Sequence, residues 1–267
     1  SDGVLDPVRL VHEAQIAKLQ KIAITDHDTV DGLVVLKKAG FLDRFSSAER
    51  PHIITGIELN ADFPGYEVHI LGYFIDIENE KLRSKLKLLV ENRRQRLLLM
   101  VEKISSLGYD LKYEDVVELA LNSTAIGRPH VAKALLRTGY FKNIKHVFDT
   151  LLSKGCPAYI PQYRLPLAEV TEIIRAAGGV AVLAHPGLVG NDTLVLKIIN
   201  QADIIGLEVY HPTHDAAQVE KYSALALKHN LKITGGSDFH GIAGRFPEKL
   251  GIFYVPADLA DSLREAR

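Results

Sequence analysis

The hydrophobic positions of this 267-residue chain alternate between helical spacing and short extended runs. Near the start, Asp6-Pro7 is followed by apolar residues at helical spacing, which predicts a capped helix with Pro7 at its first position. Further helices are predicted at 30–39, 166–177, 192–200 and 215–229. Apolar runs predict strands at 22–25, 52–58, 66–75, 180–184, 205–210, 232–234 and 250–255. Pro64-Gly65 predicts a turn, so the third strand should run antiparallel to the second.

Residues 79–154 follow a different pattern. A long helix is predicted at 80–106, ending at Gly108, and shorter helices at 113–121, 129–137 and 143–152. Because no convincing strand interrupts them, we interpret 79–154 as a helical insertion domain within a catalytic domain of residues 1–78 and 155–267. The strands of that larger domain are mostly followed by helices, which favours an α/β fold of the (β/α) barrel type over an open doubly wound sheet.

The composition excludes several kinds of site and protein class. The chain is 47% hydrophobic and 24% charged, without low-complexity tracts, as expected of an ordered globular protein. The single cysteine, Cys156, excludes an internal disulfide and a thiolate zinc cluster, so a metal would be held by His and carboxylates. We find no apolar stretch of membrane-spanning length and no signal-peptide pattern, which favours the cytoplasm.

The charge is unevenly distributed. Residues 79–154 carry 15 Lys and Arg against 8 Asp and Glu, whereas the rest of the chain carries 17 against 25. A basic segment beside an acidic body suggests a polyanionic substrate near an acidic metal site. The alternative is an ordinary solvated helix face, which charge alone favours. Arg93-Arg94-Gln95-Arg96 in the long helix could contact a nucleic-acid backbone, but the scarcity of aromatic residues nearby favours a solvated helix face.

Most polar candidates for chemistry follow predicted strands. In (β/α) barrels, functional side chains come from the carboxyl ends of the strands. The residues at these ends are Asp26, His27, Asp28, Glu58, His185, Glu208, His211, His214, Asp238 and His240. His69 lies inside a predicted strand, where a buried histidine with structural partners is the alternative to a metal ligand.

Three of these positions have specific interpretations. Asp238 and His240 lie between glycines after strand 232–234. On an extended segment they point the same way, so they could hold neighbouring metal ions or one shared phosphate. Glu58 could bridge two ions about 3.5–4 Å apart, although a lone Glu at a strand end is usually exposed.

The Asp26-His27-Asp28-Thr29 segment offers an imidazole and carboxylates together. A metal site here competes with a purely structural interpretation. In that alternative, Asp28 or Thr29 caps the following helix and Asp26 orients His27. Both interpretations can hold at once, because a metal-bound histidine normally needs a partner for its other ring nitrogen.

For two further motifs, the sequence allows both a functional and a structural interpretation. Pro186 predicts an extended backbone at His185, which is equally suited to a metal ligand and to a structural histidine before a turn. Arg128-Pro129-His130 opens a helix whose amino end can attract an anion, with Arg128 as a bidentate phosphate clamp. The alternative is that Arg128 and His130 are surface residues.

Taken together, these motifs resemble those of the PHP (polymerase and histidinol phosphatase) superfamily, and more closely its bacterial phosphoesterases acting on nucleotides and short RNA. The resemblance spans nearly the whole chain. The matching segments, in order, are Thr25-Asp26-His27-Asp28-Thr29, Gly56-Ile57-Glu58, Val68-His69-Ile70-Leu71-Gly72-Tyr73, Gly127-Arg128-Pro129-His130, Ala184-His185-Pro186-Gly187, Glu208-Val209-Tyr210 with His214, and Gly236-Ser237-Asp238-Phe239-His240-Gly241.

The resemblance implies a distorted seven-stranded (β/α) barrel with a trinuclear site for Mn²⁺, Zn²⁺ or Fe²⁺. It assigns the metal ligands as Glu58 bridging two ions, His69 and His185 completing the second, Asp238 on the first, and Asp2, His27 and His240 on the third. It further assigns phosphate binding to Arg128, with His130 and His214 as additional candidates. The implied partner is a nucleotide or short RNA, rather than a DNA duplex or a membrane.

One family motif is absent. The family's Asp-x-His-x-His run precedes Ser-Asp-Gly, and Ser1-Asp2-Gly3 resembles the tail that follows it. Two ligands of the first ion and the first strand are therefore expected upstream of Ser1 in the full-length protein.

The hypothesis from the sequence is phosphate-ester hydrolysis by a metal-bound hydroxide, which requires no protein nucleophile. Consistently, no serine or cysteine nucleophile motif is found. A histidinol-phosphate-type phosphatase is one alternative, but it leaves the basic insertion without a role. A non-catalytic metal-binding accessory module and an amidohydrolase are the others.

Overall fold

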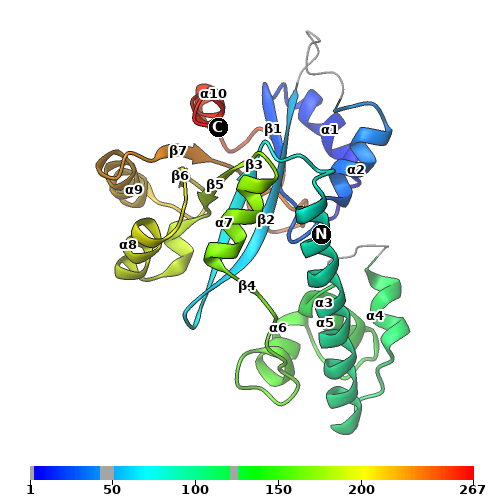
Figure 1. The fold of residues 1–267 in the computed structure, drawn as a ribbon. Coiled ribbons are helices and arrows are strands. Elements are labelled where there is room, and N and C mark those ends of the chain that lie inside the picture. Colours follow the sequence, from blue (N-terminus) through cyan, green and yellow to red (C-terminus); the bar gives the residue numbers. More distant parts are fainter. Residues whose placement is uncertain (1–2, 43–50, 121–125) are drawn as a thin grey trace. The chain divides into compact units, whose positions relative to one another are not determined.

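The computed structural model describes residues 3–42, 51–120 and 126–267, and these form two compact units (Figure 1). One unit contains residues 3–84 and 165–267, and includes the whole β-sheet. The other consists of residues 85–164 and is helical. No helix in the described ranges is long and apolar enough to cross a membrane.

The sheet is mixed and curled, with the strand order β1-β2-β3-β5-β6-β7 and with β4 beside β2. Its strands are β1 (Lys21–Ile24), β2 (His52–Phe63), β3 (Tyr66–Tyr73), β4 (Leu165–Pro166), β5 (Val180–Leu183), β6 (Gly206–Tyr210) and β7 (Lys232–Gly235). β3 runs antiparallel to both β2 and β5, and the other pairs are parallel. The predicted distorted barrel and the β2–β3 hairpin are thus confirmed.

Helices cover this sheet. They are α1 (Pro7–Ile16), α2 (Asp31–Lys38), α7 (Leu167–Ala176), α8 (Asp192–Gln201), α9 (Ala216–Lys228) and α10 (Asp258–Arg264). α1 begins as predicted, because the Asp6 carboxylate accepts hydrogen bonds from the backbone N–H groups of Val8 and Arg9. α7 packs against β2, β3 and β5, while α9 packs against β6 and β7 (Figure 1).

The predicted strand at 250–255 is wrong. This segment is irregular, and it is followed by α10. Gly251 has a φ of +80°, which interrupts an extended run, and Ile252 and Tyr254 are 53% and 83% exposed. Since these apolar side chains find no buried face, the alternation in the sequence does not produce a strand here.

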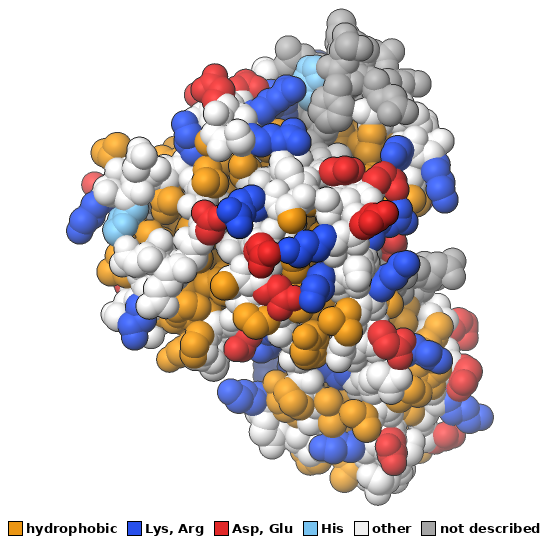
Figure 2. Space-filling model, viewed as in Figure 1, with side chains coloured by type: hydrophobic (Ala, Val, Ile, Leu, Met, Phe, Trp, Pro, Cys, Tyr) orange, Lys and Arg blue, Asp and Glu red, His pale blue; other side chains and the backbone are white. Residues whose placement is uncertain are grey.

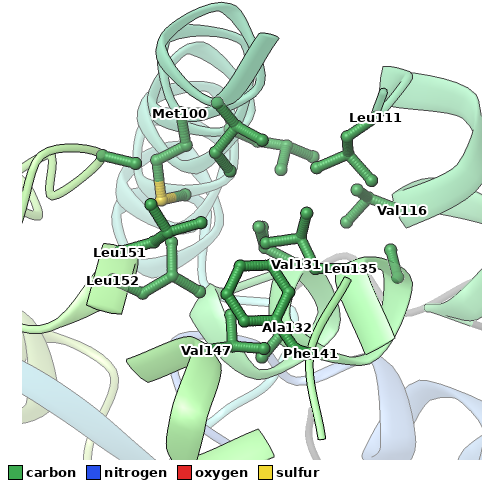
Figure 3. Close-up of a cluster of buried hydrophobic side chains, with 14 residues drawn as sticks. Met100, Leu111, Val116, Val131, Ala132, Leu135, Phe141, Val147, Leu151 and Leu152 are labelled. Atoms are coloured by element: carbon green, nitrogen blue, oxygen red, sulfur yellow. The ribbon is translucent and has the colours of Figure 1, made fainter. Parts of the chain in front are cut away.

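The helical unit has its own hydrophobic core. Its helices are α3 (Glu80–Ser106, whose first turn belongs to the other unit), α4 (Tyr113–Leu119), α5 (Arg128–Arg137), α6 (Ile144–Val147) and the π-helix η1 (Phe148–Leu152). Figure 3 shows Met100 of α3, Leu135 of α5 and Leu152 of η1 facing one cluster of buried side chains. The bounds of α3 agree with the prediction, because its apolar positions recur at helical spacing along its length.

Candidate metal centre

Glu58 lies inside β2 and not at a strand end as expected, because pairing with β3 extends β2 as far as Phe63. On its other side, β2 pairs with the loop that follows β1. The Glu58 N–H donates to Asp26 O at 3.1 Å, and the Asp28 N–H donates to Glu58 O at 2.9 Å. This pairing places His27, which lies between the two aspartates, directly beside Glu58.

Three imidazoles surround the Glu58 carboxylate. His69 Nδ1 lies 2.6 Å and His185 Nε2 3.1 Å from Oε1, and His27 Nε2 lies 3.6 Å from Oε2. The carboxylate is buried, at 5% exposure. Ligand atoms of His27, Glu58 and His69 all lie within 4.8 Å of one another, close enough to hold one metal ion. The structure therefore brings four of the predicted ligands together.

Burial alone raises the pKa of the Glu58 carboxyl. The charge of His27 and hydrogen bonds from the other imidazoles outweigh this effect and bring the pKa well below its usual value. Burial lowers the pKa of His69, but contacts with Glu58 and Glu67 raise it to about 10. Without a metal, a protonated His69 thus balances the ionised carboxylate. Metal binding at neutral pH must release that proton.

Glu67 is a partner of His69 that the sequence did not reveal. It lies two residues earlier on β3, on the same side of the strand, and its Oε1 is 3.6 Å from His69 Nε2. His69 thus presents Nδ1 to Glu58 and Nε2 to Glu67. Metal-ligating histidines commonly use their second nitrogen in this way, and the i, i+2 spacing of Glu67 and His69 was the signal available in the sequence.

His185 does not have the extended backbone that Pro186 predicted. Its φ and ψ are +24° and 63°, in a region that residues other than glycine rarely adopt. Its N–H donates to Glu208 Oε2 at 2.7 Å, which fixes this backbone while the ring contacts Glu58. Burial raises the pKa of Glu208 to about 7, although the charges of His185 and His211 oppose this shift. Glu208 is thus a buried support for His185.

Asp238 and His240 follow β7, but not on an extended segment as expected, because Asp238 has a φ of +46°. His240 Nδ1 donates to the Asp238 carbonyl oxygen at 2.7 Å, so a neutral His240 keeps a lone pair on Nε2 for a cation. Its ring centroid lies 6.4 Å from that of His27. Asp238 and His240 therefore belong to the same polar cluster as Glu58.

The Asp238 carboxylate has two neighbours, Arg245 and His211, to which the sequence analysis gave no role. Arg245 Nη2 lies 2.6 Å and His211 Nε2 3.8 Å from Oδ2. Burial raises the pKa of Asp238, but His211, His240 and Arg245 more than offset it and lower the pKa below its ordinary value. The carboxylate is therefore ionised at neutral pH, as a metal ligand must be.

His211 and His214 continue the row of rings beyond His185, with centroid distances of 5.3 and 5.4 Å. His214 Nδ1 donates to Val209 O at 2.8 Å, and its Nε2 accepts from Gly187 N at 3.1 Å. Both nitrogens of His214 therefore hold backbone in place. The predicted contact of His214 with phosphate stays a prediction.

The other phosphate candidates lie in the helical unit. His130 is 6% exposed, and its Nδ1 accepts a hydrogen bond from Gly127 N at 3.2 Å, so the surface alternative is wrong for it. Arg128 is half-buried, with its guanidinium 5.9 and 5.8 Å from the ring centroids of Phe148 and Tyr159. Their contacts with phosphate remain predictions. Asp2 lies outside the described residues.

The donor set fits divalent metal ions. Imidazole nitrogens and carboxylate oxygens are the ligands that Zn²⁺, Mn²⁺ and Fe²⁺ share. Within this cluster, two buried nitrogens, His27 Nδ1 and His211 Nε2, have no hydrogen-bond partner among the described residues. Buried polar atoms seldom stay unsatisfied, so these two are consistent with a cluster arranged around cations.

No protein-family model matches the chain, but several curated proteins do. The chain is 31% identical over 244 residues to the 5′-3′ exoribonuclease Rnm of Salmonella typhimurium, covering 90% of this chain and 82% of that protein. It is 30% identical over 253 residues to the 3′,5′-nucleoside bisphosphate phosphatase of Chromobacterium violaceum, covering 92% and 86%. A phosphoribosyl 1,2-cyclic phosphate 1,2-diphosphodiesterase of Eggerthella lenta is 30% identical over 262 residues, covering 96% of both chains.

Two solved structures share the fold over nearly the whole chain. A metal-dependent phosphoesterase from Bifidobacterium adolescentis has a TM-score of 0.81 and 30% identity, covering 98% of this chain and 91% of its own. An amidohydrolase from Chromobacterium violaceum, solved with bound sulfate, has a TM-score of 0.80 and 28% identity, covering 99% and 93%. The similarity therefore includes both compact units.

Proposed function

The chain belongs to the PHP superfamily, and we propose that it is a metal-dependent phosphoesterase that hydrolyses 3′,5′-bisphosphonucleotides, mononucleotides or the 5′ ends of short RNA. The observation that carries the proposal is the buried Glu58 carboxylate, which has imidazoles of His27, His69 and His185 within 3.6 Å. The relatives that are an exoribonuclease and a bisphosphate phosphatase support this class of substrate.

The proposed site holds up to three divalent ions, Mn²⁺, Zn²⁺ or Fe²⁺. Its ligands would be Glu58, shared by two ions, His69 and His185 for the second, Asp238 for the first, and Asp2, His27 and His240 for the third. When bound, such ions lower the pKa of water and offset the charge of phosphoryl oxygens. The buried carboxylate and its imidazoles would supply the negative charge and the lone pairs that hold the ions.

Two carboxylates that are not proposed metal ligands hold two of the ligands in position. Glu67 lies 3.6 Å from His69 Nε2 and orients the ring toward Glu58. Glu208 accepts the His185 N–H at 2.7 Å and holds that ligand in its strained backbone conformation. Because ligand geometry must be maintained as charge changes during the reaction, these residues are positioning residues of the proposed site.

The phosphate of the substrate is proposed to bind Arg128, with His130 and His214 as further contacts. We propose that the helical insertion, residues 79–154, contributes Arg128 and His130 to nucleotide binding. Figure 2 shows Lys and Arg interspersed with Asp and Glu on the visible face of the helical unit, as a solvated surface would have. The proposal therefore assigns phosphate binding to specific residues and not to a uniformly basic surface.

The direct test is hydrolysis by the full-length protein with Mn²⁺. Substrates are a 3′,5′-bisphosphonucleotide and 5′-phosphorylated RNA, with Glu58→Gln as the inactive variant. Glu172→Gln is the matched control, because Glu172 is an exposed carboxylate paired with Lys81 at 2.6 Å. Metal-dependent turnover that is lost only in Glu58→Gln supports the proposal. No turnover of either substrate refutes it.

A second candidate is hydrolysis of a cyclic phosphate diester. It is favoured by the Eggerthella lenta diphosphodiesterase, whose match covers 96% of both chains. Assaying phosphoribosyl 1,2-cyclic phosphate beside the nucleotide substrates separates the two candidates. Preferential turnover of the cyclic diester would show that the protein is a cyclic phosphodiesterase. Histidinol phosphate is assayed in parallel to test the alternative of a small, non-nucleotide substrate.

A further inference from the structure

Arg245 is a guanidinium at the metal centre that none of the proposed roles uses. It lies seven residues after Asp238, and its Nη2 is 2.6 Å from Asp238 Oδ2. Its side chain is 43% exposed, whereas that of Asp238 is 27% exposed. One end of Arg245 thus contacts a proposed ligand of the first ion, and the side chain remains open to solvent.

The loop that carries Arg245 is held by its own hydrogen bonds. Arg245 N donates to Ile242 O at 3.1 Å, and Gly244 N donates to Glu248 Oε1 at 3.2 Å. Gly244 has a φ of +78°, a conformation that glycine adopts without strain. The backbone at Arg245 is therefore fixed independently of its contact with Asp238, so the side chain can change partner while the loop stays in place.

A divalent cation and the guanidinium compete for the same carboxylate. Asp238 carries one negative charge, and Arg245 already contacts its Oδ2. A cation bound to Asp238 would repel the adjacent guanidinium, because like charges at short distance are unfavourable unless an anion lies between them. A phosphate group has several negatively charged oxygens, so it can contact the cation and the guanidinium at the same time. The planar guanidinium also matches the phosphate in shape.

We propose that Arg245 is a substrate-binding residue, which leaves Asp238 when a cation binds there and takes an oxygen of the substrate phosphate instead. This inference rests on the proposed function for the identity of the ligand. It adds a phosphate contact within the same compact unit as Glu58 and Asp238, whereas Arg128 belongs to the helical unit.

The test uses Arg245→Met in the full-length protein, which keeps much of the side-chain volume and removes the charge. Mn²⁺ binding is measured by calorimetry without phosphate, and inorganic phosphate binding is then measured with saturating Mn²⁺. Because Arg245→Met removes the guanidinium that competes with the cation for Asp238, the variant should bind Mn²⁺ at least as tightly as the wild type. Loss of a charged hydrogen bond should weaken phosphate binding by about 10-fold to 100-fold.

The matched control is Arg175→Met, because Arg175 is an exposed arginine of the same unit that pairs with Asp203 at 3.8 Å. It should bind Mn²⁺ and phosphate as the wild type does. Arg245→Lys should recover part of the phosphate affinity. Circular dichroism melting of each variant with and without Mn²⁺ identifies a general loss of structure.

The outcomes separate this inference from the proposed function. Unchanged phosphate binding in Arg245→Met overturns the inference, even if the wild type hydrolyses nucleotides. Weaker binding of both Mn²⁺ and phosphate also overturns it, since Arg245 would then only support the fold of the site. Weaker phosphate binding alone sustains it, including in a protein that hydrolyses none of the nucleotide substrates.

Discussion

Glu208 should make the stability of the metal-free protein depend on pH. Its carboxyl is 4% exposed and accepts the His185 N–H at 2.7 Å. Burial raises its pKa from an ordinary 4.5 to about 7. Replacing it by glutamine keeps an oxygen that can accept the same hydrogen bond and removes the ionisation. Glu208→Gln therefore isolates the effect of the buried charge.

The sign follows from where the proton is held. Between pH 4.5 and about 7, the folded protein keeps the Glu208 proton and the unfolded chain has released it. Raising the pH through this range therefore lowers the free energy of unfolding. One pKa unit corresponds to about 1.4 kcal/mol, so the total loss from this group is about 3 kcal/mol. It is absent below pH 4.5 and complete above pH 7.

The measurement is urea unfolding of metal-free wild type and Glu208→Gln, followed by far-ultraviolet circular dichroism at several pH values from 4.5 to 8. Relative to the variant, the wild type should lose about 3 kcal/mol across this range. Glu172→Gln, in which an exposed carboxylate is changed, should follow the wild type. Parallel curves for wild type and Glu208→Gln would show that Glu208 ionises normally and refute the reasoning.

Three further predictions concern the metals and the two cores. Asp238→Ala and His240→Ala should deplete different ions in metal analysis of the full-length protein; loss of the same ion from both contradicts the proposed ligand sets. Gly179→Ala should lower the free energy of unfolding in urea by about 1–3 kcal/mol, because the new Cβ would lie 2.7 Å from Tyr73 O. Gly3→Ala is the control, because the nearest atom to its new Cβ would be 3.8 Å away. Leu135→Ala should cost about 2–5 kcal/mol in thermal unfolding, because Leu135 is fully buried in the helical unit; a cost below 1 kcal/mol would contradict this.

Local patterns in the sequence were sufficient for most elements. Helical spacing set both ends of α3, and Pro64-Gly65 set the antiparallel hairpin of β2 and β3. Both signals depend on neighbouring residues, whose spacing decides which side chains share a face. The strand prediction for 250–255 was wrong because its alternating side chains could be buried only if the segment joined the sheet, and it does not.

The residue types of the metal centre were also visible in the sequence. The resemblance to the PHP motifs selected His27, Glu58, His69 and His185, and the structure places these four in contact. Their arrangement was not visible, because Glu58 and His185 are 127 residues apart and meet only through the register of β2, β3 and β5. Sequence spacing carries no information about such contacts.

The supporting residues were decided by the tertiary structure alone. Glu208 was a strand-end candidate in the sequence, but its role became clear only once its carboxylate was seen to hold the strained backbone of His185. Arg245 lies in an irregular loop without a motif, and its meaning comes entirely from the 2.6 Å contact with Asp238. The sequence by itself determined which groups can bind metal and phosphate. The folded chain determined which of them meet, since distances between remote residues depend on packing that no local pattern encodes.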